Sequence, residues 1–419
     1  MANTQKKKKQ PVIQGGTIQA KRKWYRIPLW IGIGLVVLLS CGVVGYLVFR
    51  EKKQPMHYDL QATICAGGDV SLSEEQLESC LQSNGEYDLY PLFSGIAQTV
   101  SSADFSVCNL EGNLTRGPSA PQSYLYPYEL ASALGKTGFD LIQTANSRTI
   151  QNGISAIGDT KAAAAAAGLN TLGSYESLQE QQEQGVLIRE INGIRFAFVA
   201  FTKGLNNMRL PDGYEYSVDL LYTDYDTSYQ KIDTEAITKK MDTAKKEDPD
   251  FIIALLHWGS ENEIGVSKMQ ENITQLLIDN DVDVIIGSHS HYVGKMEKRT
   301  VSARGKSKRE VFIAYDLGDL LTVSERSRAQ YGCLLNLTFE KDSTTGGKKL
   351  SLISYTPTYC QSPSETLKTN GYAVLDILDA LQLREQKYYD SISEELANHL
   401  QEILEQLKSQ TESGYQIRK

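Results

Sequence analysis

Residues 281–291 read DVDVIIGSHSH, in which an apolar run ends at a glycine and two histidines follow it. Apolar runs of about four to eight residues that are bounded by glycine are typical of buried strands. Between residues 62 and 320 the same arrangement occurs six times, each run being followed by polar residues of the kinds that bind metals. The six runs are residues 62–67, 105–108, 139–145, 251–256, 281–287 and 311–317. The sequence therefore predicts buried strands with functional side chains at their ends.

The polar residues after these runs are expected to meet at one rim of the fold. In α/β sheets, ligands bind beyond the carboxyl ends of the strands. The candidate residues are Asp69, Asn109, Glu111, Asn146, Ser147, Arg148, His257, His289, His291 and Asp319. This set holds three of the chain's five histidines, and imidazole together with carboxylate ligands suits a pair of divalent metal ions.

His289 and His291 form the strongest pair, because two histidines separated by one residue after a glycine-ended run can both point into one cavity. His257 ends another run, and the first pair strengthens its interpretation as a ligand. Asp69 and Glu111 are favoured as oxygen ligands, since one carboxylate can bridge two cations. Taken alone, each of these two carboxylates would more readily be read as a cap on a helix or a turn.

The charge of the chain is divided unevenly. The formal net charge is −8, but residues 1–53 contain eleven Lys or Arg and a single acid, which leaves 32 basic and 50 acidic residues for 54–419. A nucleic-acid-binding protein normally shows a basic face, so this balance argues against that class and no nucleic-acid partner is expected. The apolar content of 41% and the charged content of 22% are ordinary for a globular protein.

Residues 27–49 contain no charged side chain, and about 20 such residues span a bilayer as a helix. Eight Lys or Arg precede this stretch, whereas three follow it closely. By the positive-inside rule, residues 1–26 form a cytoplasmic basic tail, 27–49 a single-pass signal anchor in the cell membrane, and 50–60 a linker to an extracellular domain. The alternative is a cleaved signal peptide, which the length of the run and the lack of an A-x-A site disfavour.

The pattern after the linker predicts a layered α/β sandwich over residues 61–365. Helices are expected at 161–167, 234–247 and 268–279, and Asn192-Gly193 predicts a two-residue hairpin turn between 186–190 and 194–201. Residues 366–419 form a helical segment in which apolar residues recur at helical spacing over 392–407. Two alternatives are open for this amphipathic helix: it packs on its own domain, or it joins a second copy in a homo-oligomer or another partner.

The six cysteines do not form a disulfide scaffold at this chain length. Cys65, Cys108 and Cys333 lie in apolar runs and are expected to pack as small apolar side chains. Cys80 and Cys360 would be able to pair in an oxidising exterior, a question that the sequence leaves open.

The ordered motifs resemble those of the CapA family, the poly-γ-glutamate capsule biosynthesis proteins. Members of that family typically show GD, NLEG, ANNH, HWG, GxHxH and LGN in this order. In this chain the corresponding residues are 68–69, 109–112, 145–148, 257–259, 287–291 and 317–319. The resemblance covers residues 60–359 and implies a metallophosphoesterase-like α/β/β/α sandwich that follows one N-terminal transmembrane helix.

The resemblance also implies the metal ligands. Carried over residue by residue, it assigns Asp69, Glu111 and His291 to one site, and Glu111, His257 and His289 to the other. The cofactors would be two divalent metal ions, with manganese, zinc and iron as candidates.

Three residues depart from the family motifs. Ser147 replaces an Asn that is expected as a metal ligand, Arg148 replaces a His that is expected as a general acid, and Asp319 replaces the Asn of LGN. Arginine cannot give up a proton near neutral pH, although it can bind a phosphate or carboxylate through two hydrogen bonds. Asn146, Ser147 and Asp319 are therefore expected to bind metal or to support its ligands. Arg148 is expected to contact substrate, and Asn109 is expected to orient substrate or Glu111, with a turn role as the alternative.

Three functions follow from the resemblance and these departures. The first is a membrane-anchored CapA-like protein that takes part in the synthesis or export of an anionic capsule polymer, beside polyglutamate-synthase-like membrane subunits. The second is an extracellular dinuclear-metal hydrolase of the phosphoesterase kind. The third is a non-catalytic scaffold that retains the fold. The first is the preferred hypothesis, and catalysis is left open.

Overall fold

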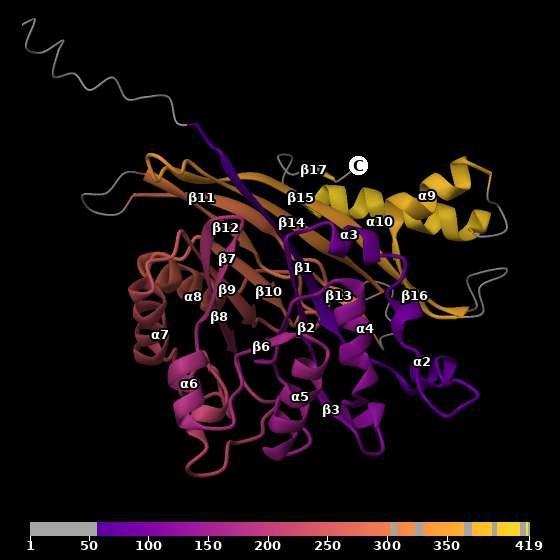
Figure 1. The fold of residues 1–419 in the computed structure, drawn as a ribbon, viewed down its shortest axis with the longest axis horizontal. Coiled ribbons are helices and arrows are strands. Elements are labelled where there is room, and N and C mark those ends of the chain that lie inside the picture. The colour runs from indigo at the N-terminus through magenta and orange to yellow at the C-terminus, as the bar shows by residue number, and fades with distance from the viewer. Residues whose placement is uncertain are drawn as a thin grey trace, which may run out of the picture. The chain divides into compact units, whose positions relative to one another are not determined.

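Two β-sheets are stacked face to face, and the six apolar runs supply their central strands (Figure 1). The computed structural model describes residues 57–302, 308–322, 330–363, 371–387, 392–410 and 416–417, which belong to one compact unit that begins at residue 56. The larger sheet has the order β16-β15-β14-β1-β2-β5-β6, with β13 paired to β1 and β17 to β15. Its strands are β1 (Leu60–Val70), β2 (Phe105–Leu110), β5 (Leu141–Gln143), β6 (Asn170–Leu172), β13 (Asp319–Leu321), β14 (Tyr331–Lys341), β15 (Lys348–Gln361), β16 (Ala373–Asp376) and β17 (Gln416–Ile417).

The smaller sheet has the order β11-β12-β10-β9-β8-β7. Its strands are β7 (Leu187–Ile191), β8 (Ile194–Thr202), β9 (Phe251–His257), β10 (Val284–Ser288), β11 (Met296–Ser302) and β12 (Lys308–Ala314). The four inner strands run parallel, and an antiparallel strand closes each edge. The predicted hairpin joins β7 to β8, and φ is positive at both Asn192 and Gly193, as a two-residue turn of this kind requires.

Helices cover the outer faces of both sheets, which gives the α/β/β/α layering expected from the sequence. On the larger sheet lie α2 (Glu74–Ser79), α3 (Ala97–Ser101), α4 (Glu129–Thr137) and α5 (Ser155–Ala166), and on the smaller sheet lie α7 (Thr234–Lys246) and α8 (Lys268–Asp279). The short helix α6 (Leu178–Gln184) has no buried residue. A short parallel pair, β3 (Asn113–Thr115) and β4 (Leu125–Pro127), completes the region beside α5.

Aromatic side chains fill the space between the sheets. The rings of Phe196 and Phe339 meet edge to face with their centres 5.0 Å apart, and Phe105 lies 5.1 Å from Phe198. Such pairs add to the stability that burial of their apolar surface provides. This packing fixes the position of one sheet on the other. The carboxyl ends of the strands in the two sheets are therefore held at fixed positions relative to one another.

The C-terminal hairpin of α9 (Ile377–Glu385) and α10 (Glu394–Gln410) packs on its own domain. Leu396, Leu400 and Leu407 are buried in the same core as Tyr355 and Tyr359 of β15. Of the two alternatives for this amphipathic helix, the structure therefore shows the first. The homo-oligomer through 392–407 stays a prediction, and the apolar face proposed for it is covered by the chain itself.

The predictions for the N-terminal region and for a disulfide between Cys80 and Cys360 have different outcomes. The basic tail, the signal-anchor helix at 27–49 and most of the linker lie outside the described residues. None of the helices formed by the described residues has the length and apolar character that crossing a membrane requires. Cys80 and Cys360 are both buried and no disulfide joins them.

Candidate metal centre

Two groups of metal-ligand side chains lie at the carboxyl ends of the central strands. Glu111, His257 and His289 form one group, and Asp69, His291 and Asp319 form the other. Within each group, the candidate ligand atoms all lie within 4.8 Å of one another. His257 lies between the groups, since its Nε2 is 3.3 Å from Glu111 Oε1 and its Nδ1 is 3.8 Å from Asp69 Oδ1.

Strand register brings these residues together from distant parts of the chain. Asp69 on β1 pairs with Asn109 on β2 and with Asp319 on β13, and Ser288 on β10 pairs with His257 on β9. Gly68 permits the close approach of β1 to β13, because a Cβ there would lie 1.7 Å from the carbonyl oxygen of Gly318. A side chain at this position would therefore separate the two carboxylates of the second group.

The first group is almost fully enclosed and is short of hydrogen-bond partners. Ser147 Oγ donates to Glu111 Oε1 at 3.1 Å and lies 3.3 Å from His257 Nε2. The buried Nδ1 of His289 has no hydrogen-bond partner among the described residues. Buried polar atoms are normally paired, so an unpaired imidazole nitrogen beside a carboxylate and a second imidazole fits a site for a metal ion.

The second group is held by an ion pair at the mouth of the site. His291 Nδ1 lies 2.9 Å from Asp319 Oδ1 and 3.9 Å from Asp69 Oδ2. Asp69 also accepts hydrogen bonds from the Asn109 amide at 2.6 Å and from the backbone N–H of His289 at 3.0 Å. One imidazole and two carboxylates are a suitable set for a divalent ion that accepts both nitrogen and oxygen ligands.

The two groups differ in their charge state, because Glu111 and His289 of the first are free of protons whereas His291 of the second carries one. Burial acts to raise the pKa of Glu111, but the hydrogen bond and charge of His257 outweigh it and lower that pKa to about 2. Burial and the positive charges around His289 hold its pKa well below the usual value, so this imidazole keeps a lone pair. Burial opposes the charged form of His291, but Asp319 raises its pKa to about 11, and an incoming metal ion has to displace that proton.

The loop that carries the two histidines has an unusual backbone. His289 has a φ of 110° and His291 a φ of 65°, values that side chains other than glycine rarely adopt. Asp316 holds this loop, since its carboxylate accepts the backbone N–H of Ser290 at 2.7 Å and that of Gly318 at 2.8 Å. Strained backbone of this kind persists where the surroundings fix it, and it is concentrated at functional sites.

We expect Asp316→Ala to lower the free energy of unfolding by about 2 kcal/mol, because two buried N–H groups would lose their acceptor. Asp316→Asn keeps one acceptor oxygen and should cost less. Urea unfolding of the two variants at neutral pH is the measurement. Equal stabilities for the Ala and Asn variants would contradict this role.

A cationic rim borders the first group. The guanidinium carbon of Arg148 lies 4.1 Å from the centre of the Tyr124 ring, and its Nη2 is 4.0 Å from Glu261 Oε1. Lys203 follows β8 directly, donates to the carbonyl oxygen of Gly259, and is close enough to His289 to lower the pKa of that imidazole. Arg148 and Lys203 can therefore offer two positive charges to an anion that approaches the centre.

The structure brings every sequence-predicted site residue to this one region. Asn146 donates to the Asn109 carbonyl at 3.3 Å and to the backbone of Leu110, and Asn109 donates to Asp69, so the two amides form a chain that ends on this carboxylate. The grouping differs from the one implied by the resemblance, because Asp319 takes the place of Glu111 beside Asp69 and His291. The sequence reasoning missed the loop support by Asp316 and the rim residues Tyr124, Lys203 and Glu261.

The fold and the site together define a class of α/β sandwich proteins with candidate metal ligands at the strand ends. Residues 63–324, more than half of the chain, match the family described as bacterial capsule synthesis protein PGA_cap. The chain therefore belongs to this family, and the resemblance to CapA proteins is confirmed.

Two curated relatives carry the same family name. The capsule biosynthesis protein CapA of Bacillus anthracis is 24% identical over 253 residues, which are 60% of this chain and 49% of the relative. The PGA biosynthesis protein CapA of Bacillus subtilis (strain 168) is 21% identical over 220 residues, or 52% of this chain and 51% of the relative. The chain thus spans about half the length of these relatives.

Solved structures of hydrolases are similar at a lower level. A phosphatase from Mycoplasma pneumoniae shares 16% identity at a TM-score of 0.41, over 72% of this chain and 94% of that one. The sulfate thiohydrolase SoxB of Thermus thermophilus, in complex with glycerol, shares 11% identity at a TM-score of 0.35, over 85% of this chain and 61% of that one. The assignment to the family rests on the match over residues 63–324.

Proposed function

We propose that this protein is a membrane-anchored member of the capsule synthesis family that acts in the synthesis or export of an anionic polymer. By family resemblance the polymer is poly-γ-glutamate, and the partners are polyglutamate-synthase-like membrane subunits. The anchor is the apolar stretch at 27–49, which places the α/β domain outside the cell. The observation that carries the proposal is the convergence of the family motifs, far apart in the sequence, on two adjacent groups of candidate metal ligands, of which all but His291 are buried.

The metal centre supplies the contact with the polymer in this proposal. Glu111, His257 and His289 would hold one divalent ion, and Asp69, His291 and Asp319 would hold the other. The domain outside the membrane is acidic, so it would repel a polyanion unless cations stood between them. Metal ions at the strand ends supply such cations.

Arg148 and Lys203 extend the same positive region beyond the metal groups. The Arg148 guanidinium is stacked on Tyr124, which fixes the plane of its donors, and its buried Nε has no partner among the described residues. A planar guanidinium binds carboxylate and phosphate oxygens through two hydrogen bonds. We propose that Arg148 contacts the carboxylates of the polymer and that Asn109, which donates to Asp69, acts by positioning that ligand.

A hydrolase is the second candidate, and the preservation of both ligand groups favours it over a bare scaffold. Two bound ions would activate a water molecule and stabilise charge that develops on a substrate. Arg148 cannot act as a proton donor to the leaving group near neutral pH, so that step would need another acid or solvent. A scaffold that binds partners without metal is the remaining alternative.

Polymer production in cells tests the proposal. We expect Asp69→Ala, Glu111→Ala and His291→Ala each to reduce both the metal content of the purified protein and the amount of surface polymer. Matched controls are Asp159→Ala, Glu183→Ala and His57→Ala, which remove the same kinds of side chain from exposed positions. Unchanged metal content and unchanged polymer in all three site variants would overturn the proposal.

Turnover separates the remaining alternatives, and capture of the membrane subunits checks that each variant is intact. If the protein acts as an enzyme, His289→Ala abolishes turnover of a phosphoester or polyglutamate substrate while the variant still binds the membrane subunits. If it is a scaffold, the wild-type chain shows no turnover with metal supplied, and His289→Ala captures the subunits as well as the wild type does.

A further inference from the structure

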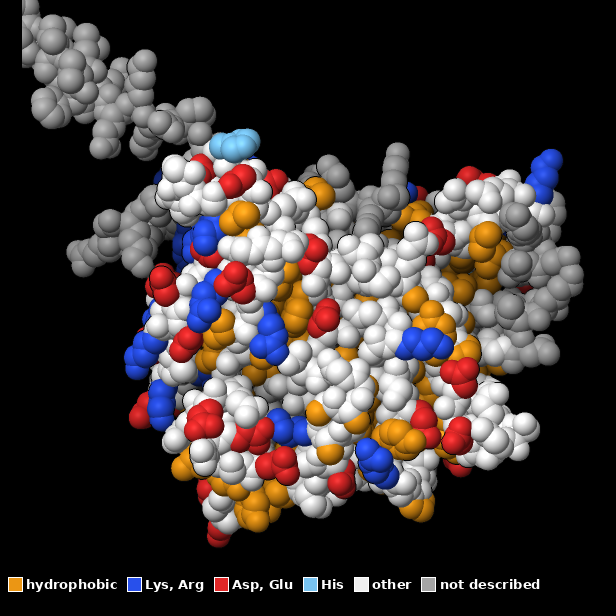
Figure 2. Space-filling view, viewed as in Figure 1, with side chains coloured by type: hydrophobic (Ala, Val, Ile, Leu, Met, Phe, Trp, Pro, Cys, Tyr) orange, Lys and Arg blue, Asp and Glu red, His pale blue; other side chains and the backbone are white. Residues whose placement is uncertain are grey.

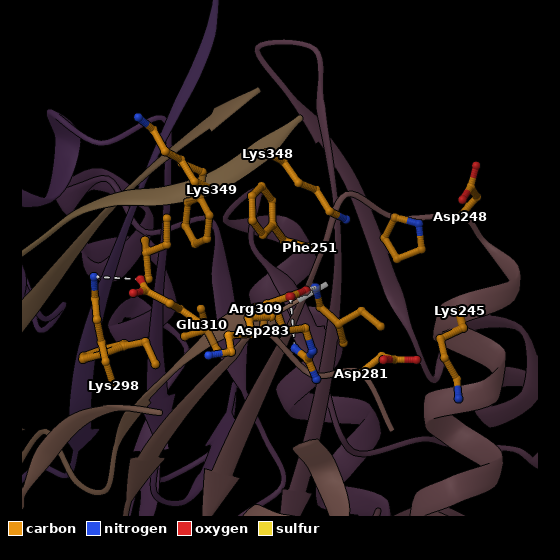
Figure 3. Close-up of a pocket in the computed structure, with 17 residues that line it drawn as sticks. Lys245, Asp248, Phe251, Asp281, Asp283, Lys298, Arg309, Glu310, Lys348 and Lys349 are labelled. Atoms are coloured by element: carbon orange, nitrogen blue, oxygen red, sulfur yellow. Dashed lines mark hydrogen bonds and ion pairs between the residues drawn. The ribbon is translucent and has the colours of Figure 1, made fainter. Parts of the chain in front are cut away.

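A basic cavity lies at the end of the sandwich opposite to the metal centre. It has a volume of about 710 Å³ and opens beside Phe251 and Val284, where β9 and β10 begin, whereas the metal ligands lie where these strands end (Figure 3). A volume of this size is within the range of about 300–1,000 Å³ that ligand sites in proteins occupy. The cavity is therefore large enough for a ligand and is separate from the proposed catalytic or polymer-binding region.

The lining of this cavity combines an apolar floor with a cationic rim. The floor is formed by the buried rings of Phe251, Phe312 and Phe339. The basic residues of the rim are Lys245, Lys298, Lys308, Arg309, Lys348 and Lys349, and the acidic ones are Asp248, Asp281, Asp283 and Glu310. This local excess of positive charge stands out in a domain that is acidic overall, and Figure 2 shows Lys and Arg side chains among acidic ones over the same side of the molecule (left in the view).

The rim lysines remain accessible to an anion. Lys298, Lys308, Lys348 and Lys349 are all exposed, and Figure 3 shows Lys298, Lys348 and Lys349 placed around Phe251. Arg309 serves the structure instead, since it donates to the carbonyl oxygens of Ile278 and Val282 and pairs with the largely buried Asp283. Lys298 pairs with the exposed Glu310 at 3.3 Å, Lys349 pairs with Glu340 at 3.0 Å, and Lys348 donates to the carbonyl oxygen of Asp250. Ion pairs between exposed side chains add little stability, so the phosphate of a ligand can compete for these lysines.

This cavity lies at the end of the domain where the chain enters it. Strand β1 begins at this end of the domain (Figure 1). Its first residue, Leu60, pairs with Lys341, and the Lys349 ammonium lies 4.0 Å from the centre of the Tyr58 ring. Ten residues separate Leu60 from Phe49, the last residue of the apolar stretch. Ten residues reach at most about 35 Å, so an anchor at 27–49 would keep this end of the domain near the membrane surface.

We propose that this cavity binds the headgroup of an anionic phospholipid of the membrane that holds the anchor. The exposed lysines contact the headgroup phosphate, and the phenylalanine floor receives the apolar part of the lipid that adjoins it. The proposal rests on the proposed anchoring of residues 27–49. Its consequence is an orientation, because a domain bound in this way directs the metal centre, at the opposite ends of β9 and β10, away from the bilayer.

The test uses the full chain reconstituted in nanodiscs of phosphatidylglycerol or of phosphatidylcholine. We expect backbone hydrogen exchange within residues 308–314 and 348–352 to be about tenfold slower or more in the anionic discs. A variant with Lys298→Gln, Lys308→Gln and Lys349→Gln should lose this difference, since each lysine near an anionic surface strengthens binding about fivefold. The matched control, Lys136→Gln, Lys231→Gln and Lys268→Gln, has the same net charge and should retain the difference.

The outcomes distinguish this proposal from the anchoring on which it rests. The lipid site is overturned if hydrogen exchange in the wild type is equally fast in both lipids. It is also overturned if soluble polyglutamate, in place of lipid, slows hydrogen exchange. Release of the chain from the membranes by an alkaline wash contradicts the anchor. The released chain is then titrated with vesicles of the two lipids, and equal binding to both would overturn the lipid site as well.

Discussion

His257→Ala should reduce the bound divalent metal from about two ions per chain to one, with the remaining ion held by Asp69, His291 and Asp319. The variant leaves Glu111 and His289 as the sole members of the first group, and two ligands are too few for a stable site. Replacement of residues that merely support a ligand already costs about 10–100-fold in affinity, so loss of a ligand should cost more than about 100-fold. Elemental mass spectrometry of the purified full chain, after metal has been offered, measures the metal content.

The reciprocal variant and an exposed control complete this test. His291→Ala should also leave one ion per chain, but in the Glu111 group, and the double variant should bind none. His57→Ala removes an exposed imidazole at the other end of the domain and should leave both ions in place. Two ions in His257→Ala would show that this imidazole is not a ligand, and no ion in the wild type would favour the scaffold alternative.

The central strands could be predicted because their sequences are continuous apolar runs. The run at 251–256 became β9 (Phe251–His257), and the helix predicted at 268–279 became α8 (Lys268–Asp279) with the same bounds. The order of the strands could not be predicted, because it depends on which apolar faces meet after the chain has folded. The pairing of β1 with β14, which lies some 270 residues further along the chain, leaves no local pattern in either segment.

The region around Gly68 shows the limit of local reasoning. Gly-Gly-Asp was expected to end a strand, yet β1 continues through Asp69 to Val70. The reason is tertiary, because β13 lies against β1 at this point and the carbonyl of Gly318, the residue before β13, occupies the space that a Cβ on Gly68 would need. The two glycines are visible in the sequence, but the sequence does not indicate that a second strand packs against them.

The clustering of the candidate metal ligands could be predicted because each follows a recognisable run, and the supporting residues could not. Asp316 lies within the apolar run at 311–317, and nothing near it indicates that it holds the loop of His289 and His291. Lys203 directly follows β8, but it belongs to none of the motifs. Asp319 was interpreted as a departure from LGN, and the structure shows that its carboxylate lies at hydrogen-bonding distance from His291.

Lys240→Met should lower the free energy of unfolding by about 3–5 kcal/mol, because it breaks a buried ion pair. The Lys240 ammonium on α7 pairs with Asp219 and lies 3.2 Å from the Tyr175 hydroxyl, which itself donates to Asp219 at 2.5 Å. The side chains of Lys240 and Asp219 are 11% and 4% exposed. Methionine keeps the packing of the aliphatic stem, so the loss reports chiefly on the Asp219 charge left without its partner.

Two further variants identify the cause of the loss of stability: a double variant of the buried pair, and a variant that breaks an exposed ion pair on the same helix. Lys240→Met combined with Asp219→Asn removes both charges and should recover much of the stability, since a buried pair adds little over neutral groups that fit the same space. Lys245→Met breaks the pair with Asp242, whose side chains are 33% and 53% exposed, and should cost less than about 0.5 kcal/mol. Urea unfolding with an unchanged dependence on denaturant is the measurement. If an unpaired buried charge causes the loss, the double variant should recover stability. A double variant as unstable as the single one would therefore show that the stability comes from the packing of these side chains.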